Sequence, residues 1–306
     1  MTQKSVRISM LIILVAGLVV QSVNFTGSGQ SAAKAQLSTT QQLWDMMNSI
    51  NSGLEAIGEE IRVDYAEYLT ADDSSEVGQT VFFNNRGNKQ LNAHFVPGDP
   101  RRGGRTNITY IVDQTEGAID GLSVAQTTAA IDRAMTTWNN VQCATIPITK
   151  LPNRPGDLGV VEFLSGLGGS PFFFADITHA GWLPAGILPP NVIAVTFTFI
   201  WVDGNGLPTD IDNNGKFDVA FREILYNDLF TWRINGNIDV ETVALHESGH
   251  GLSQDHFGKA FLTGSNGKIH FAPRAVMNAA YSGIQQDIKG TDNGGHCSIW
   301  ASWPNN

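Results

Sequence analysis

The sequence has few charged residues and almost no cysteine. Of its 306 residues, 16% are charged, 42% are hydrophobic and two are Cys. An average soluble protein carries roughly 25% charged residues, and disordered chains combine high charge with low hydrophobicity, so intrinsic disorder and a coiled coil are excluded for the bulk of the chain. Internal repeats and low-complexity tracts are absent. The length and apolar content indicate one large globular domain or two small ones.

Basic clusters are also missing. Nineteen basic residues stand against 29 acidic ones, which gives a net charge of −10, and the longest basic run is Arg101–Arg102. A nucleic-acid-binding surface needs clustered Lys and Arg to neutralise phosphates. The composition therefore predicts no nucleic-acid partner.

The first residues predict export. Lys4 and Arg7 precede an uncharged apolar run over residues 8–20, which is shorter than the roughly 18 residues needed to cross a bilayer. This pattern is typical of a signal peptide, so we expect residues 1–35 to be removed, with Ala33–Ala35 as the cleavage signal and residues 20–22 as a competing one. A secreted, extracellular protein without stable membrane association follows. An uncleaved N-terminal anchor is the alternative.

The two cysteines are the only candidates for a disulfide. In an oxidising compartment Cys143 and Cys297 are natural partners, and closing so long a loop would constrain the unfolded chain by about 5 kcal/mol in an entropy model. The alternative is two buried free thiols. No Cys precedes Cys143, so a lipoprotein anchor is excluded.

Residues 36–104 read as a region of their own. Apolar residues at spacings of three and four predict an amphipathic helix from Leu43 to Ile61, whose stripe is most simply a docking face. A propeptide or partner-binding role is the alternative. Residues 80–83 and 91–96 flank a polar stretch, which predicts a hairpin. Residues 98–104 read as a linker.

From residue 105 onward, strands and helices are mixed. The pattern predicts strands at residues 107–112, 160–164, 172–177 and 195–201, and a helix over residues 124–140. A strand, a helix, several strands and a second helix indicate an α+β fold.

That second helix carries the chemistry. Residues 239–252 are predicted to be helical with Asp239 as N-cap. Residues i and i+4 lie one turn apart on the same face, so His246 and His250 can bind one Zn²⁺ through neutral nitrogens. Glu247 lies beside them and can hold and deprotonate a water.

A further absence limits the choice of the third ligand. No Glu follows Glu247, so a distant downstream glutamate cannot complete the site. Gly251 can end the helix and let the chain reverse, which would bring His256 back to the metal. His256 is therefore the predicted third ligand. The remaining substitutes are Asp255, His270, Asp287, Asp292 and His296.

These residues resemble the metzincin zinc metallopeptidases, and within them the matrixin-like branch. The family pattern H-E-x-x-H-x-x-G-x-x-H matches His246, Glu247, His250 and His256, with Ser253 in place of the Gly. The family Gly takes a positive φ, so either Ser253 adopts it at roughly 1 kcal/mol or Gly251 makes the turn. The resemblance covers residues 105–306. It implies a metzincin-like catalytic domain with a twisted mixed β-sheet, an active-site helix and a Met-turn.

Residues 275–281 resemble that Met-turn. Matrixins carry a Tyr four residues after the Met, as Tyr281 follows Met277 here, whereas astacin-like relatives place it where this chain has Ala279. The resemblance implies that Met277 packs under the imidazoles and that Tyr281 lines the S1′ substrate pocket. Matrixin latency through a propeptide Cys is impossible, because residues 36–104 contain none.

An acidic loop precedes the site. Asp210, Asp212, Asn214 and Asp218 match positions of an EF-hand-type loop around Gly215, with oxygen ligands at alternate residues as Ca²⁺ requires. Position 12 is Phe221, so Glu223 would have to replace the usual bidentate Glu. The prediction is a structural calcium ion, and the alternative is a solvated acidic turn.

Together these features predict a secreted zinc-dependent endopeptidase that cleaves protein or peptide substrates. A zinc-bound water would attack the peptide bond with Glu247 as general base, and the substrate would add to an edge strand of the sheet. The alternative is an exported calcium- and zinc-binding structural or adhesion protein without catalysis, which would favour a closed site with a fourth protein ligand from Asp255 or His270.

Overall fold

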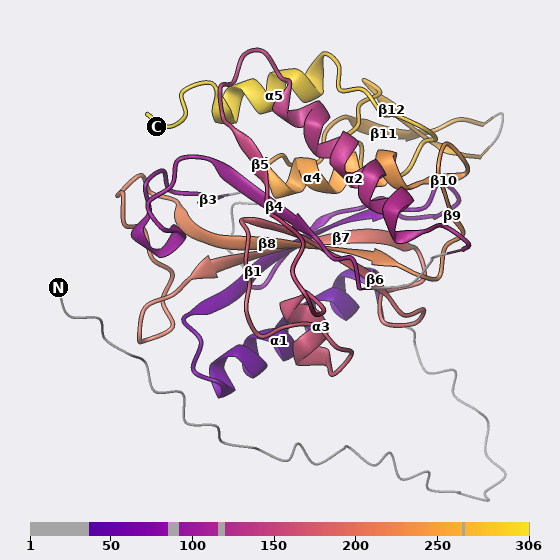
Figure 1. The fold of residues 1–306 in the computed structure, drawn as a ribbon. Helices are drawn as coiled ribbons and strands as arrows, with labels where there is room; N and C mark the ends of the chain where they lie inside the picture. Colours follow the sequence, from indigo (N-terminus) through magenta and orange to yellow (C-terminus); the bar gives the residue numbers. More distant parts are fainter. Residues whose placement is uncertain (1–36, 85–91, 116–119, 265–266, 306) are drawn as a thin grey trace, which may run out of the picture. The chain divides into compact units, whose positions relative to one another are not determined.

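The computed structural model describes residues 37–84, 92–115, 120–264 and 267–305, and residues 37–306 form one unit. A mixed eight-stranded sheet lies at its centre, in the order β2-β1-β7-β8-β6-β4-β5, with β3 beside β8 (Figure 1). Strands β4, β5, β6 and β8 run parallel, while β7, β1 and β2 pair antiparallel. The predicted α+β class with a mixed sheet is confirmed.

The sheet strands are β1 (Ile61–Thr70), β2 (Thr80–Phe82), β3 (Ala93–His94), β4 (Ile108–Val112), β5 (Ile148–Lys150), β6 (Ile177–Leu183), β7 (Val192–Trp201) and β8 (Phe217–Asn227). Two small sheets pair β9 (Trp232–Arg233) with β10 (Ile238–Asp239) and β11 (Lys259–Leu262) with β12 (Ile269–Ala272). The helices are α1 (Thr39–Ala56), α2 (Val124–Asn139), α3 (Val160–Ser165), α4 (Val240–Gly251) and α5 (Thr291–Trp300), with a 3₁₀ turn at Pro100–Arg102.

Helices cover both faces of the sheet. Helices α2, α4 and α5 lie on one side, and α1 and α3 lie on the other (Figure 1). Two apolar cores result, one between the sheet and α2 and α4, the other beneath α1 and α3. Strand β7 serves both cores, because its alternating side chains point to opposite faces. Phe197 and Phe199 enter the core under α1, whereas Thr196 and Thr198 face α4.

The described residues between 37 and 104 belong to this same fold. Strand β1 pairs with β7 along nearly its whole length, and α1 docks its apolar face on β1 and β2. The predicted docking face is thus found, but the helix ends at Ala56 and Ile61 begins a strand. Gly58 has φ +75°, which a left-handed turn requires and which stops the helix.

Three local predictions were wrong. The predicted hairpin does not form: β2 pairs with β1, while β3 pairs with β8, and the residues between them lie partly outside the described chain. Residues 160–165 are the helix α3 rather than a strand, because a short apolar run does not distinguish the two. Residues 172–176 are irregular, and β6 starts only at Ile177.

The predicted linker is anchored rather than loose. Arg102 is buried, and its guanidinium donates to Asp176 Oδ1 at 2.8 Å and to the carbonyl of Val96. Arg105 reaches the same carboxylate at 2.9 Å. These bonds outweigh burial and hold the pKa of Asp176 below its ordinary value, so the carboxylate stays charged.

Cys143 and Cys297 form a disulfide, as predicted. The bond joins the segment after α2 to α5, with 5.6 Å between the two Cα atoms. It ties the C-terminal helix to the core that supports α4.

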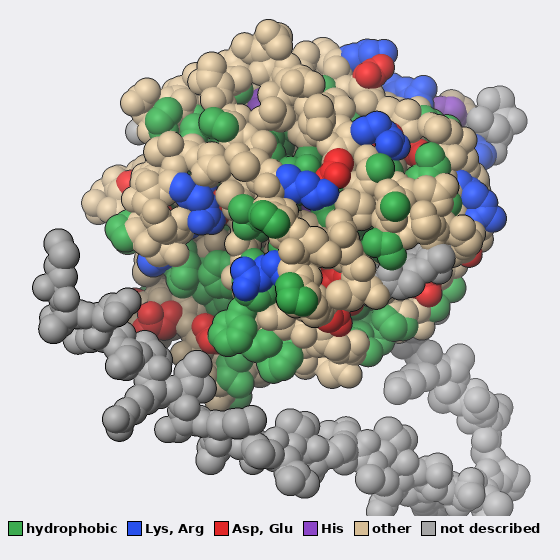
Figure 2. Space-filling model, in the orientation of Figure 1, with side chains coloured by type: hydrophobic (Ala, Val, Ile, Leu, Met, Phe, Trp, Pro, Cys, Tyr) green, Lys and Arg blue, Asp and Glu red, His purple; other side chains and the backbone are tan. Residues whose placement is uncertain are grey.

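The predicted signal peptide, residues 1–35, lies outside the described residues. Within the described ranges, no helix has the length and apolarity to span a membrane. Figure 2 shows Lys and Arg side chains scattered singly over one face, with apolar side chains gathered toward the α1 and α3 end.

Candidate metal centre

Helix α4 is held rigidly from its first residue. The carboxylate of Asp239 accepts from Thr242 N–H at 2.9 Å, so Asp239 is the N-cap that the sequence predicts. All helical residues are buried. In addition, the Trp138 indole of α2 donates to the carbonyl of Leu245 at 2.8 Å. The two histidines therefore project from a fixed platform.

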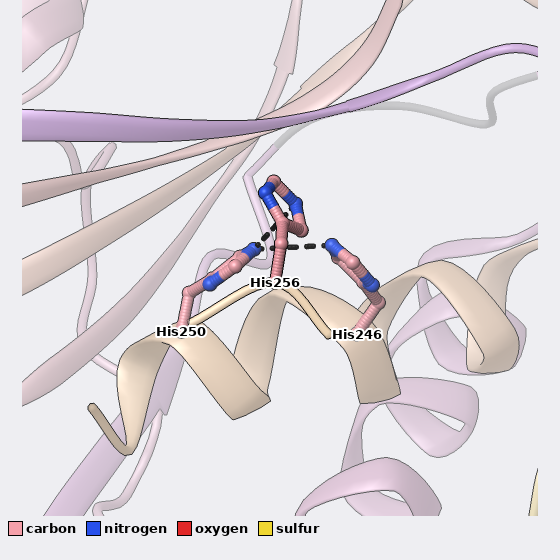
Figure 3. Close-up of side chains that lie close together, drawn as sticks. All are labelled: His246, His250 and His256. Atoms are coloured by element: carbon pink, nitrogen blue, oxygen red, sulfur yellow. Dashed lines mark hydrogen bonds between the residues drawn. The ribbon is translucent and has the colours of Figure 1, made fainter. Parts of the chain in front are cut away.

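Three imidazoles converge above this helix (Figure 3). The Nε2 atom of His250 lies 3.1 Å from His246 Nε2 and 3.2 Å from His256 Nε2. Tetrahedral Zn²⁺ with bonds of 2.0–2.1 Å places its ligand nitrogens about 3.3 Å apart. The spacing fits one zinc ion, and among the described residues no fourth imidazole or carboxylate joins the group.

Backbone carbonyls set the tautomers of the two helical histidines. Nδ1 of His246 lies 2.7 Å from the Val276 carbonyl, and Nδ1 of His250 lies 2.8 Å from the Gln254 carbonyl. A carbonyl only accepts, so each Nδ1 carries the hydrogen and each Nε2 keeps its lone pair for a metal.

Burial keeps these imidazoles neutral. It lowers the pKa of His250 to about 4, and lowers the pKa values of His246 and His256 well below the ordinary value, with repulsion from neighbouring imidazoles adding to both. Neutral imidazole is the form that binds metal. The group is therefore ready to accept a cation at neutral pH.

The chain reverses between the second and third histidine at Ser253. Helix α4 ends at Gly251, and Ser253 takes φ +65°, so Ser253 makes the left-handed turn and Gly251 does not. This conformation costs a non-glycine residue roughly 1 kcal/mol. Arg222 offsets the cost, because one of its Nη atoms donates to both the Gly251 carbonyl and Ser253 Oγ.

Met277 lies beneath the helix. A side chain added at Gly249 would overlap its sulfur, so the two residues are in direct contact. Asp292 braces this turn, since its carboxylate accepts from the N–H groups of Val276 at 3.0 Å and Met277 at 3.1 Å. The Val276 carbonyl that orients His246 is thereby fixed from below.

Tyr281 is 5% exposed and lies at the start of α4. Its hydroxyl accepts from Asp239 N–H at 3.1 Å. Little of this side chain is open to a substrate in this conformation.

Glu247 is fully buried beside the imidazoles. Its Oε2 accepts from Thr196 Oγ1 at 2.6 Å, while Oε1 has no hydrogen-bond partner among the described residues. Burial raises the pKa of Glu247 well above its ordinary value; the Thr196 bond opposes this and Glu67 adds to it. A buried carboxylate oxygen without a partner can accept a hydrogen bond from a water or from a polarised ligand.

The acidic loop forms only part of the predicted calcium site. Carboxylate oxygens of Asp210, Asp212 and Asp218 lie within 4.8 Å of one another. Arg101 already contacts Asp218 at 2.7 Å, and the Asn214 side-chain amide donates to Asp212 rather than presenting its oxygen. The guanidinium of Arg101 therefore already neutralises part of the negative charge of this cluster.

Glu223 is not part of this cluster, contrary to the prediction. It lies inside β8, and its carboxylate accepts from the N–H groups of Val160 and Val161 at 2.7 and 2.9 Å. Strand β8 begins at Phe217, which carries Glu223 along the sheet and away from the loop. Burial raises its pKa to about 7.

The other possible third ligands lie elsewhere. Asp255 accepts from its neighbour His256 N–H, and Asp292 serves the turn at Met277. His296 is buried against Trp138, and His270 lies in strand β12. Asp287 lies on an exposed stretch before α5.

Sequence reasoning missed Thr196 and Glu67, and it named Asp292 only as a substitute ligand rather than as the support of the turn at Met277. One signal was present: the strand V-T-F-T-F places two threonines on one face of an otherwise apolar segment. The chain matches no protein-family model, and a search of curated proteins found no match. Function is therefore inferred from the residues and their geometry.

Proposed function

We propose that this protein is a zinc-dependent endopeptidase of the metzincin type. The observation that carries the proposal is the convergence of three neutral imidazole nitrogens next to a buried glutamate oxygen that has no partner. Three protein ligands and a free fourth position are typical of catalytic rather than structural zinc.

Each residue has a definite part in the reaction. His246, His250 and His256 would hold the ion, which when bound supplies Lewis acidity toward a peptide carbonyl and toward water. Glu247 takes the proton from the attacking water through Oε1 and returns it to the leaving amine. Thr196 holds the other oxygen at 2.6 Å, so the carboxylate keeps one orientation throughout.

Met277 and Tyr281 support the metzincin assignment by position. Met277 lies under the helix α4, which carries His246 and His250. Tyr281 follows four residues later and contacts Asp239 at the start of α4. We further propose export, which the Cys143–Cys297 disulfide supports because disulfides persist in oxidising compartments. A calcium ion at Asp210, Asp212 and Asp218 is proposed as a structural element only.

One observation favours the non-catalytic alternative. Glu247 and His250 are each 0% exposed, so no substrate can reach them in this conformation. A zinc-binding structural protein would need no access.

The deciding experiment is cleavage of an unfolded protein by the zinc-loaded chain, before and after limited proteolysis with a serine peptidase that is then blocked. Glu247→Ala should retain one zinc and lose turnover by about 10²–10⁴-fold, the usual contribution of a general base. A zinc chelator should stop cleavage by the parent. Zinc-loaded protein that cleaves nothing in either form, or Glu247→Ala that cleaves as fast as the parent, would contradict the proposal.

A further inference from the structure

Two stretches of backbone flank the group of histidines and Glu247. On one side lies β7, whose Thr196 holds Glu247. On the other side lies the segment from Ala279 to Tyr281, which follows Met277. An extended peptide binds such a track by adding main-chain hydrogen bonds to an exposed strand edge. This inference rests on the proposed function, because it concerns access to the same zinc and the same Glu247.

The chain's own strand β1 already fills the track beside β7. Glu67 of β1 is the register partner of Thr196, so β1 crosses next to the proposed general base. The Glu67 side chain is fully buried, and its Oε1 lies 3.2 Å from Nδ1 of His250. Strand β7 therefore has no free edge at the level of the metal centre.

The end of β1 also takes the opposite side of the track. The Thr70 carbonyl accepts from Tyr281 N–H at 2.8 Å, and Thr70 forms a parallel bridge with Ala280. Further along, Gly78 N–H donates to the Ala279 carbonyl at 2.6 Å. The segment runs antiparallel to β7 and parallel to residues 279–281. It therefore occupies the main-chain hydrogen-bonding groups that a bound peptide would need.

We propose that residues Glu67–Gly78, here called the covering segment, are a built-in inhibitor of the site. They lie where an extended peptide substrate would bind, so the folded chain holds zinc but admits no peptide until this segment is displaced. Latency would then come from main-chain competition for β7 and for residues 279–281, without a cysteine that ligates the metal.

The covering segment is attached differently at its two ends. Upstream, Ile61 and Val63 pack in the core under α1 and hold the rest of β1 in place. Downstream, the turn over residues 72–76 is largely exposed, and its ion pair of Asp72 with Lys268 joins two side chains that are each about half exposed. Such surface pairs contribute little stability. Displacement can therefore start at the turn while α1 and the beginning of β1 stay folded.

A substitution at Gly78 can displace the covering segment. A Cβ atom at this position would overlap the Tyr68 carbonyl oxygen and lie 2.7 Å from the Ala279 carbonyl oxygen. Both obstacles are backbone: Tyr68 belongs to the covering segment itself and Ala279 to the facing residues 279–281, so Gly78→Ala should disrupt the packing within the segment as well as its contact with Ala279. Gly204→Ala is the matched control, because an added Cβ there has no atom within 4 Å. Thr70→Val is a milder second variant, which removes the hydroxyl bonds to the carbonyls of Glu76 and Ala279.

The test measures binding of two zinc-directed probes to the zinc-loaded full chain by calorimetry. Acetohydroxamate is small, whereas a tripeptide hydroxamate needs the track. The wild type and Gly204→Ala should bind the tripeptide probe no tighter than acetohydroxamate. Gly78→Ala should bind it at least tenfold tighter, with acetohydroxamate unchanged; Thr70→Val should change in the same direction and serves if Gly78→Ala fails to fold.

Two outcomes would overturn the inference: a wild type that binds the tripeptide probe as tightly as Gly78→Ala does, or variants that fold and show no gain. Binding requires zinc but no turnover, so the measurement can be repeated in the Glu247→Ala background. A gain there together with absent cleavage would leave the covering segment established and contradict only the proposed catalysis.

Discussion

Among the described residues, two clusters of side chains could hold a metal ion, and they differ in what neutralises them. Burial keeps the imidazoles of His246, His250 and His256 neutral. Asp210 and Asp212 lie on a partly exposed loop, whereas Asp218 is buried at the start of β8, and Arg101 already provides a positive charge at 2.7 Å from Asp218. The first cluster is organised for an ion, whereas the second is partly satisfied without one.

This difference shows why clustering alone is weak evidence. Exposed carboxylates gather on loops because water screens their repulsion, and the turn around Gly215 is stabilised by backbone N–H bonds to Asp210. Buried imidazoles have no such reason to meet, since desolvated nitrogen atoms at 3.1 Å gain little from one another. The histidine group therefore indicates a ligand more strongly than the aspartate group does.

The largest effect is expected from removing one imidazole. His250→Ala should reduce bound zinc from one per chain to almost none, because the two remaining nitrogens cannot complete a stable site. Metal analysis after dialysis against a weak chelator measures this. His270→Ala, at a histidine outside the group, should keep its zinc. Equal zinc content in His250→Ala and His270→Ala would contradict the assignment of His250 as a ligand.

Removing the carboxylate that braces the turn at Met277 should weaken zinc binding, but less than removing an imidazole does. Asp292→Asn replaces an acceptor of two N–H groups by a side chain with one acceptor oxygen, which loosens Val276 and hence His246. Loss of such outer support typically weakens metal binding by about 10- to 100-fold. Competition with a chromogenic zinc chelator gives the affinity. Asp287→Asn, at an exposed neighbouring position, is the control, and an unchanged affinity in Asp292→Asn would count against a preorganised site.

The third prediction concerns the acidic loop and tests whether calcium stabilises the folded chain. If calcium binds, a saturating concentration of about 100 Kd should stabilise the chain by about 2.7 kcal/mol, and Asp212→Ala should lose this gain. Thermal unfolding with calcium or with a calcium chelator measures the difference. Asp203→Ala changes an acidic residue outside the cluster and should retain the gain. A calcium effect that is identical in Asp212→Ala and the parent would remove the calcium proposal.

The smallest predicted effect concerns a buried histidine outside both clusters. Burial against Trp138 lowers the pKa of His296 to about 4, so the unfolded chain binds more protons than the folded chain below pH 6.5. Its contribution is complete above pH 6.5 and declines as the pH falls toward 4, by about 1 kcal/mol between pH 6.5 and 5.5. Urea unfolding at both pH values should show a smaller loss in His296→Phe than in the parent. An identical loss would contradict the predicted titration.

The convergence of the three histidines could be predicted from the sequence because their pattern is local. His246 and His250 need only a helix, and a helix with Asp239 as N-cap is readable from its own residues. His256 was also predictable, since six residues and a turn suffice to bring it back. That Ser253 rather than Gly251 makes this turn was left open, because the deciding contact comes from Arg222, in a strand more than twenty residues earlier.

The surroundings of the site could not be predicted in the same way. Strands β1 and β8 are buried on both faces, so their sequences lack the alternation that marks a half-exposed strand. Ile61 continued the helical spacing of α1 by chance, although Gly58 was a stop signal. Glu67 reaches His250 only through the register of β1 on β7, which depends on distant pairing.

We propose that the three imidazoles form a metal site whose fourth position is open to a reacting ligand. The most direct measurement is the visible absorption of the cobalt-substituted protein, recorded before and after addition of acetohydroxamate. We expect one Co²⁺ per chain with the intense bands of a tetrahedral ion, and a shift of these bands when the hydroxamate takes the open position. A chain that binds no cobalt, or a spectrum that does not respond to hydroxamate as expected of a site closed by four protein ligands, would contradict it.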